Sequence, residues 1–244
     1  MQLTQSLYAW TACLITASFW VPVVQAESLL TVGATPFNLV YNSATAGALE
    51  KDRFIFSDPN AWRVQKENNS STLELTNQSK YTPLVRSPIN IAVLSNQAVG
   101  SFTLEAELLQ TSREYGHRDL CIFFGIKSPT EFYYLHLATA ADNNAHNIFL
   151  VNKKPRTNIA IETTKGVEWG QNIWHKVKVE RRVEDGSIAV FFDDMSKPIM
   201  RAKDQTFTKG LIGFGSFDDT GIFRNIRLSS DKSDKAQFSF SIAR

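Results

Sequence analysis

The stretch SFTLEAEL (residues 101–108) alternates apolar and polar side chains along its whole length. Because successive side chains of a strand point to opposite faces, its four apolar residues fall on one side of an extended chain. This pattern predicts a strand with one face in a core and the other toward solvent. A helix would repeat its apolar positions every three or four residues, and long helical patterns are hard to find in this sequence.

Similar runs lie on both sides of this stretch. They occupy residues 120–124, 133–137, 176–180, 187–192, 211–217 and 222–228. Residues typical of turns separate them, as in SDPN (57–60), KSPT (127–130), EDGS (184–187) and DTG (219–221). The 17 Phe residues and the abundant Val, Ile and Thr also favour strands. We therefore expect an all-β fold, a two-sheet antiparallel sandwich of the jelly-roll type.

Several longer motifs follow one another in a recognisable order. They are DRF (52–54), WHKVKV (174–179) with GSIAVFFDD (186–194), GLIGFG (210–215) and GIFRNIRL (221–228). Together they resemble the concanavalin A-like lectin/glucanase superfamily, close to its laminin-G-like branch and to exported glycoside-hydrolase-like domains. The resemblance covers residues 52–228 and implies a concanavalin A-like domain there. It specifies a fold rather than an activity.

The chain outside this domain divides into three parts: a signal peptide (1–26), a leader segment (27–51) and a C-terminal tail (229–244), which we expect to be loosely held. Residues 1–26 contain no charged side chain and end in the small-x-small pattern VQA, which is typical of a signal peptidase site. Thr, Ser and Pro interrupt their apolar stretch, so no integral membrane span is expected. The sequence predicts an exported protein, periplasmic or extracellular.

Charge and cysteine content narrow the possible functions. The formal net charge is +2 and 20% of residues are charged, which argues against a basic nucleic-acid-binding domain. Of the two cysteines, Cys13 lies in the predicted signal peptide, so Cys121 has no partner in the mature chain. Neither an intrachain disulfide framework nor a cysteine-based zinc site is expected.

A dense group of polar residues lies between positions 113 and 156, where three of the four histidines occur. If the apolar residues of runs 120–124 and 133–137 face the core, alternation places a second set on the outward face: His117, Asp119, Tyr134 and His136. An outward aromatic ring with polar neighbours suits a sugar, whose C–H face stacks on the ring while its hydroxyls form hydrogen bonds. We therefore predict a glycan-binding or active-site face there, with Arg118, His146 and Arg156 at its rim. The alternative is a solvated sheet face with incidental histidines.

Catalysis on this fold remains an open alternative. Glycosidases of the superfamily use Glu-x-Asp-x-x-Glu on one strand, and the nearest fragment, Glu105-Ala106-Glu107, lacks the third carboxylate. The His, Tyr and Arg residues of the polar group would suit a polysaccharide lyase, in which Arg neutralises a uronate carboxylate and Tyr or His moves protons.

The sequence contains two sets of candidate metal ligands. Asp218 and Asp219 precede Thr220-Gly221 and could supply oxygens to a structural Ca²⁺, although a type I turn uses the same residue types. A site built from His117, Asp119, His136 and His146 has no supporting H-x-H or H-E-x-x-H spacing. A structural Ca²⁺ is therefore the one cofactor for which the sequence offers a candidate site.

The residues of the motifs that carry the resemblance are predicted to have structural roles. His175 has the parity of Val177 and Val179, which predicts a buried, hydrogen-bonded histidine. Trp174 is also predicted to be a core residue whose truncation costs about 3–5 kcal/mol. The other predicted core residues are Phe54, Trp62, Leu104, Ile122, Phe124, Leu135, Val177, Val179, Val190, Ile212, Phe214 and Ile226.

The sequence favours an exported carbohydrate-binding, lectin-like domain whose partner is a poly- or oligosaccharide. A carbohydrate-active enzyme, either a glycoside hydrolase or a polysaccharide lyase, is the first alternative. A structural envelope protein is the second.

Overall fold

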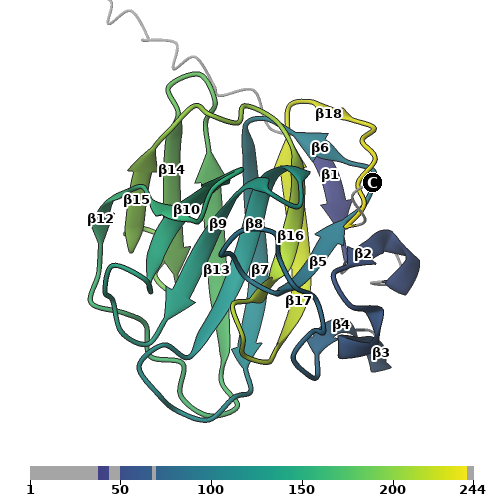
Figure 1. Ribbon diagram of the computed structural model, residues 1–244, viewed down its shortest axis with the longest axis vertical. Helices are drawn as coiled ribbons and strands as arrows, with labels where there is room; N and C mark the ends of the chain where they lie inside the picture. The colour runs from purple at the N-terminus through teal and green to yellow at the C-terminus, as the bar shows by residue number, and fades with distance from the viewer. Residues whose placement is uncertain (1–37, 44–49, 68–69, 241–244) are drawn as a thin grey trace, which may run out of the picture. The chain divides into compact units, whose positions relative to one another are not determined.

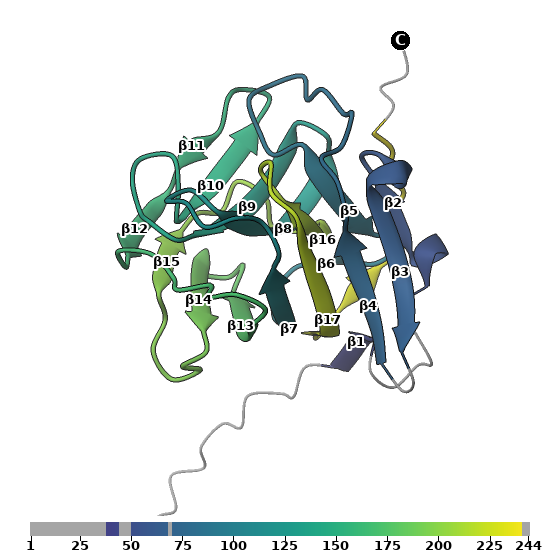
Figure 2. The same ribbon diagram turned by 90° about the horizontal axis from the view of Figure 1, so that it is seen from below.

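The computed structural model describes residues 38–43, 50–67 and 70–240, which form two antiparallel sheets (Figure 1). The sheets face each other as the two layers of a sandwich (Figure 2). Sheet A contains, in spatial order, β12 (Ala160–Thr163), β15 (Met200–Lys203), β14 (Ser187–Phe192), β13 (Trp174–Arg181), β7 (Phe102–Gln110), β17 (Gly221–Ser230), β4 (Ser70–Leu75) and β3 (Trp62–Glu67), with β1 (Asn38–Asn42) also paired to β17. Sheet B contains β11 (Thr157–Asn158), β10 (Asn147–Asn152), β9 (Glu131–Ala138), β8 (Asp119–Ser128), β16 (Leu211–Ser216), β5 (Asn90–Leu94) and β2 (Phe54–Phe56).

Short elements complete the described chain. They are the strand pair β6 (Ala98–Val99) and β18 (Ser233–Asp234) and the 3₁₀ turns η1 (Lys51–Arg53) and η2 (Pro59–Ala61). The predicted two-sheet antiparallel sandwich is confirmed. Within the described residues, no helix is long and apolar enough to cross a membrane.

The alternating stretch at residues 101–108 forms most of β7, at the centre of sheet A. Its apolar residues Leu104, Ala106 and Leu108 are buried, whereas Glu105 is exposed. Pairing with β13 sets Val177 opposite Ala106, so that apolar residues of neighbouring strands share the core face.

Two predictions about β13 have opposite outcomes. His175 is buried beside Val177, with Nδ1 2.8 Å from Asp193 Oδ2 and Nε2 2.9 Å from the Trp169 carbonyl oxygen, which confirms a structural histidine. Trp174 was predicted to be in the core, and this is wrong. Because neighbouring residues of a strand face opposite ways, Trp174 lies half-buried on the outer face, where the Arg224 guanidinium stacks 3.8 Å from its ring centroid. The other predicted core residues are buried.

Sheet B is apolar on both faces, unlike sheet A. On β8, Ile122 and Phe124 face the core between the sheets, whereas Cys121 and Phe123 belong to a second apolar cluster on the outer face. That cluster also contains Tyr134 of β9 and Phe149 and Val151 of β10, among others. A strand with both faces covered has a continuous apolar run, as LCIFF (120–124) does.

The C-terminal tail supplies part of this cover. After β18 pairs with β6, the alternating residues Ala236, Phe238 and Phe240 pack against the outer cluster of sheet B, and Phe240 makes an edge contact with Tyr81. The tail is therefore packed as far as residue 240, rather than loosely held. In the predicted leader, β1 joins sheet A, and the predicted signal peptide lies outside the described residues.

Candidate functional site

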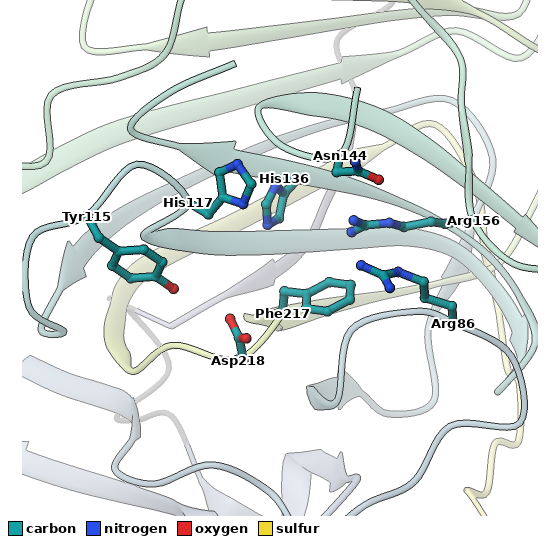
Figure 3. A pocket seen from close by; sticks show the side chains of 8 residues that line it. All are labelled: Arg86, Tyr115, His117, His136, Asn144, Arg156, Phe217 and Asp218. Carbon is teal, nitrogen blue, oxygen red and sulfur yellow. The ribbon is translucent and has the colours of Figure 1, made fainter. Parts of the chain in front are cut away.

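A cavity of about 240 Å³ lies on the outer side of sheet B, where β8 begins and β9 ends (Figure 3). Its walls come from five loops and from β9, which brings residues far apart in the sequence to one place. The lining residues are Arg86, Tyr115, His117, His136, Asn144, Arg156, Phe217 and Asp218. The cavity is thus built where loops from both ends of sheet B converge over its outer side.

Strand pairing positions the floor of this cavity. Cys121 of β8 lies opposite His136 of β9, so Asp119, two residues before Cys121, projects from the same face as His136. The distance from Asp119 Oδ2 to His136 Nε2 is 3.3 Å. Pairing of β16 with β8 then brings in Phe217, whose backbone N–H donates to Asp119 Oδ2 at 2.9 Å. Asp119 therefore ties three parts of the site together.

Hydrogen bonds determine where His136 carries its proton. The His146 backbone N–H donates to His136 Nδ1 at 3.2 Å, so in the neutral ring the proton is on Nε2, toward Asp119. Burial acts to raise the pKa of Asp119, but His136 and the hydrogen bonds from Phe217 N–H and the Cys121 thiol keep that pKa below its usual value. Burial and the Asp119 charge raise the pKa of Cys121, so its thiol stays protonated. His136 is therefore held in one orientation at the cavity wall.

One end of the cavity is rich in arginine. The Arg156 guanidinium carbon lies 4.4 Å from the ring centroid of Phe217 and 4.9 Å from that of Phe149, and its Nη1 donates to the Tyr134 hydroxyl at 2.8 Å. Arg86 lies over the same Phe217 ring at 5.9 Å. In Figure 3 both guanidinium groups extend over the Phe217 side of the cavity.

The other end is acidic. Asp218 lines the cavity, and the Tyr115 hydroxyl donates to Asp219 Oδ2 at 2.6 Å. Burial, together with the charge of Asp119, raises the pKa of Asp219 to about 6 although the Tyr115 hydrogen bond lowers it. Burial and the same charge raise the pKa of Asp218. Three carboxylates are thus close enough to oppose one another's ionisation.

These carboxylates also fit the predicted calcium site. One oxygen each of Asp119, Asp218 and Asp219 lies within 4.8 Å of the others, and Asp119 Oδ1 is buried without a hydrogen-bond partner. Oxygen donors are the ligands that Ca²⁺ prefers, so all three residues could hold such an ion. Within the described part of the chain, no cluster of three potential metal ligands includes His117 or His146. The predicted histidine-based metal site is therefore not supported.

The structure brings together most of the residues predicted for the site. His117, His136 and Arg156 line the cavity, and Asp119 lies directly beneath His136. His117 Nε2 is 2.7 Å from Asp142 Oδ2, and both side chains are about half exposed. The two runs pair as an antiparallel hairpin across the Ser128-Pro129 turn.

Three residues that were predicted for the site lie elsewhere in the fold. Arg118 was expected at the rim but is buried, with Nε donating to Gln110 Oε1 at 2.6 Å and Nη1 to the Gly170 carbonyl at 2.8 Å. His146, also expected at the rim, is fully buried, and burial lowers its pKa to about 4. Tyr134 has the predicted parity but is not accessible, because Phe123 and Phe149 stack on it and leave it unexposed. None of the three lines the cavity.

The sequence analysis did not identify four lining residues: Arg86, Tyr115, Asn144 and Phe217. Phe217 takes the place expected of Tyr134, as an accessible aromatic ring among polar groups. The sequence held one indication of this role, because Phe217 directly precedes the predicted metal ligand Asp218. Its closeness to Asp119 comes from the pairing of β16 with β8. Arg86 had no such signal, because only the folded chain brings its loop to sheet B.

The glycosidase fragment lies elsewhere. Glu105 and Glu107 are on the outer face of sheet A, and Glu107 forms an ion pair with Arg224 at 2.7 Å. Neither residue lines the cavity.

No protein-family model matches the sequence, and no curated protein matches it. Solved structures do. The carbohydrate-binding module CBM66 from Bacillus subtilis is 15% identical, with a TM-score of 0.52 over 73% of this chain and 96% of that one. A Bacillus subtilis protein of unknown function with a galectin-like fold is 11% identical, with a TM-score of 0.53 over 82% and 99%. Lectin I-B4 from Griffonia simplicifolia is 15% identical, with a TM-score of 0.48 over 78% and 98%.

At these identities the likeness shows the fold. The chain has the concanavalin A-like jelly roll of lectins and glucanases, as its motifs indicated.

Proposed function

We propose that the protein is a carbohydrate-binding domain that holds a sugar in the cavity beside Phe217. The observation that carries the proposal is the combination of an accessible aromatic ring with polar groups around it. The exposed side chains of His117, Asn144 and Asp218 offer both donors and acceptors, which suits sugar hydroxyls. The part of the half-buried Phe217 ring that Arg156 leaves uncovered offers apolar surface for the C–H groups of the sugar. A similar fold in a protein named as a carbohydrate-binding module supports this reading.

The state of the nearby tyrosines argues against an elimination in which tyrosine is the base. Burial and the hydrogen bond to Asp219 raise the pKa of Tyr115, and burial raises that of Tyr134. A tyrosine that holds its proton firmly is a poor base for a lyase reaction. We further propose, from residues 1–26, that the protein is exported and meets its glycan outside the cytoplasm.

The test is retention on glycans with a matched pair of variants. Phe217 and Trp174 are both half-buried aromatic residues with an arginine stacked on them, but they lie on different sheets. Affinity gel electrophoresis should show that Phe217→Ala weakens glycan binding about tenfold or more, equivalent to about 1.4 kcal/mol. Trp174→Ala should bind like the wild type.

Three results would contradict the proposal. If the wild type is retained by none of a broad set of glycans, carbohydrate binding is wrong. If Phe217→Ala is retained as strongly as the wild type, the cavity is the wrong site. If the wild type releases reducing ends or unsaturated sugars, the protein is an enzyme rather than a binding domain.

A further inference from the structure

Two arginines share the cavity and are held in place by their loops. The Arg156 backbone N–H donates to the Arg86 carbonyl at 3.1 Å, which joins the loop after β10 to the loop before β5. Both guanidinium groups then lie over the Phe217 ring, at 4.4 and 5.9 Å. The two positive charges are therefore preorganised on one side of the cavity, as Figure 3 shows.

No carboxylate of the described chain forms an ion pair within 4.0 Å with either arginine. Among the described residues, the ion pairs within 4.0 Å include Arg63–Glu74, Arg201–Glu162 and Arg224–Glu107, but none includes Arg86 or Arg156. The side-chain hydrogen bond of Arg156 goes to the neutral Tyr134 hydroxyl. Three other surface arginines (Arg63, Arg201 and Arg224) are paired with glutamates, whereas Arg86 and Arg156 face a cavity.

We propose that the cavity selects an acidic sugar, whose carboxylate or sulfate group lies between Arg86 and Arg156. This inference rests on the proposed function and names its substrate class. A guanidinium presents several N–H donors in one plane, which match the oxygens of a carboxylate or sulfate. With the anionic group at this end, the sugar ring faces Phe217.

The acidic end of the cavity determines the orientation in which the sugar would bind. Asp218 lines the wall away from the arginines and would repel a second anionic group, but it accepts hydrogen bonds from hydroxyls. The site therefore suits one charged substituent per bound sugar, with hydroxyls toward Asp218. A uniformly basic groove for a polyanion would have no such acidic wall.

The experiment compares each acidic polymer with its own neutral form. A polyuronate and its carboxyl-reduced form test the carboxylate, and a sulfated galactan and its desulfated form test the sulfate. We expect the wild type to bind at least one acidic polymer about tenfold more strongly than its neutral form, with retention falling as salt rises.

The variants test whether the arginines cause this preference. Arg86→Gln keeps hydrogen-bond donors, removes the charge and changes an exposed residue, so folding should be preserved. It should reduce acidic-polymer binding about tenfold and so narrow the difference between an acidic polymer and its neutral form. Arg156→Gln should do the same, and the matched control Arg224→Gln on sheet A should change neither. Melting temperatures show whether each variant folds.

The outcomes separate this inference from the proposed function. Equal binding of acidic and neutral forms, lost in Phe217→Ala, would overturn the acidic-sugar inference and keep the carbohydrate site. An acidic preference that Arg224→Gln reduces as much as Arg86→Gln would also overturn it, because the attraction would then be general. Retention on no glycan at all would overturn the proposed function itself.

Discussion

The outer faces of the two sheets differ in what covers them and in how their charges are balanced. On sheet A, the outer residues of β7 and β13 alternate with the core residues, and their charges pair locally, as in Glu107–Arg224 and Lys178–Glu180. On sheet B, the outer face is apolar and covered, and beside this cover lies a cavity with arginines at one end and carboxylates at the other.

This difference indicates where function resides. Charges that neighbours neutralise on a solvated face need no partner, and such exposed pairs contribute little to stability. Charges left without a counterion in a cavity are costly unless a ligand meets them. We therefore propose that the face of sheet B carries the site, and the face of sheet A serves as an internal control.

The largest expected contrast is in stability. Tyr134 on sheet B and Trp174 on sheet A both lie on outer faces and both contact an arginine. Tyr134→Ala should lower the free energy of unfolding by about 3–5 kcal/mol, because it opens a cavity between Phe123 and Phe149. Trp174→Ala should cost about 1 kcal/mol, because its ring is half exposed. Urea unfolding measures both, and equal losses would contradict the difference between the faces.

The same contrast explains how far the sequence could be read. Alternation at β7, β8 and β9 predicted the strands, and it correctly put Asp119, Tyr134 and His136 on one face, since a register error would move every side chain to the other side. Alternation did not predict that other side chains cover the outer face of sheet B. The run LCIFF (120–124) is apolar at both parities, which itself indicates a strand buried on both faces. The outward set was therefore wrongly expected to be accessible.

The rest of the site depends on long-range contacts that no local pattern encodes. Arg86 reaches the cavity through a loop, and Phe217 through the pairing of β16 with β8. The packed tail is similar, because Phe238 and Phe240 alternate with polar residues but have a partner surface only after sheet B forms. Sequence periodicity predicts faces, and tertiary packing decides which face is covered.

The next contrast is a pH effect confined to the site on sheet B. Burial, with a smaller effect of His136, lowers the pKa of His146 from 6.5 to about 4. Between these pH values the unfolded chain binds a proton that the folded chain does not, so stability rises with pH in this range. Lowering the pH from 6.5 to 4 should therefore reduce the free energy of unfolding by up to about 3 kcal/mol from this group.

His146→Asn tests this assignment, since Asn tolerates the positive φ of 52° at this position. Between pH 6.5 and 4, urea unfolding should show a smaller loss of stability for His146→Asn than for the wild type. The difference between the two proteins isolates this histidine, because the raised pKa of Asp219 has the opposite effect and acts in both. A steep slope retained in His146→Asn would contradict the prediction.

A smaller effect is expected from the tail that covers sheet B. Changing Phe238 and Phe240 to Ser together should lower the free energy of unfolding by about 1–2 kcal/mol, because both rings are partly buried against the outer cluster. The exposed apolar surface should also bind a dye such as ANS. Gln237→Ser, an outward-facing change in the same segment, is the control. A double variant with wild-type stability and dye binding would show that the tail does not cover this face in solution.

The smallest expected effect concerns the acidic end of the cavity. If Asp119, Asp218 and Asp219 hold Ca²⁺, the ion stabilises the folded chain by about 1.4 kcal/mol at ten times its dissociation constant, because the unfolded chain lacks the site. Millimolar Ca²⁺ should therefore raise the melting temperature by a few degrees. Asp218→Asn should abolish this response, whereas Asp193→Asn, beside His175 on sheet A, should keep it. If Ca²⁺ leaves the melting temperature of the wild type unchanged, the three carboxylates do not hold the cation, and the contrast in charge between the two faces rests on the arginine end of the cavity.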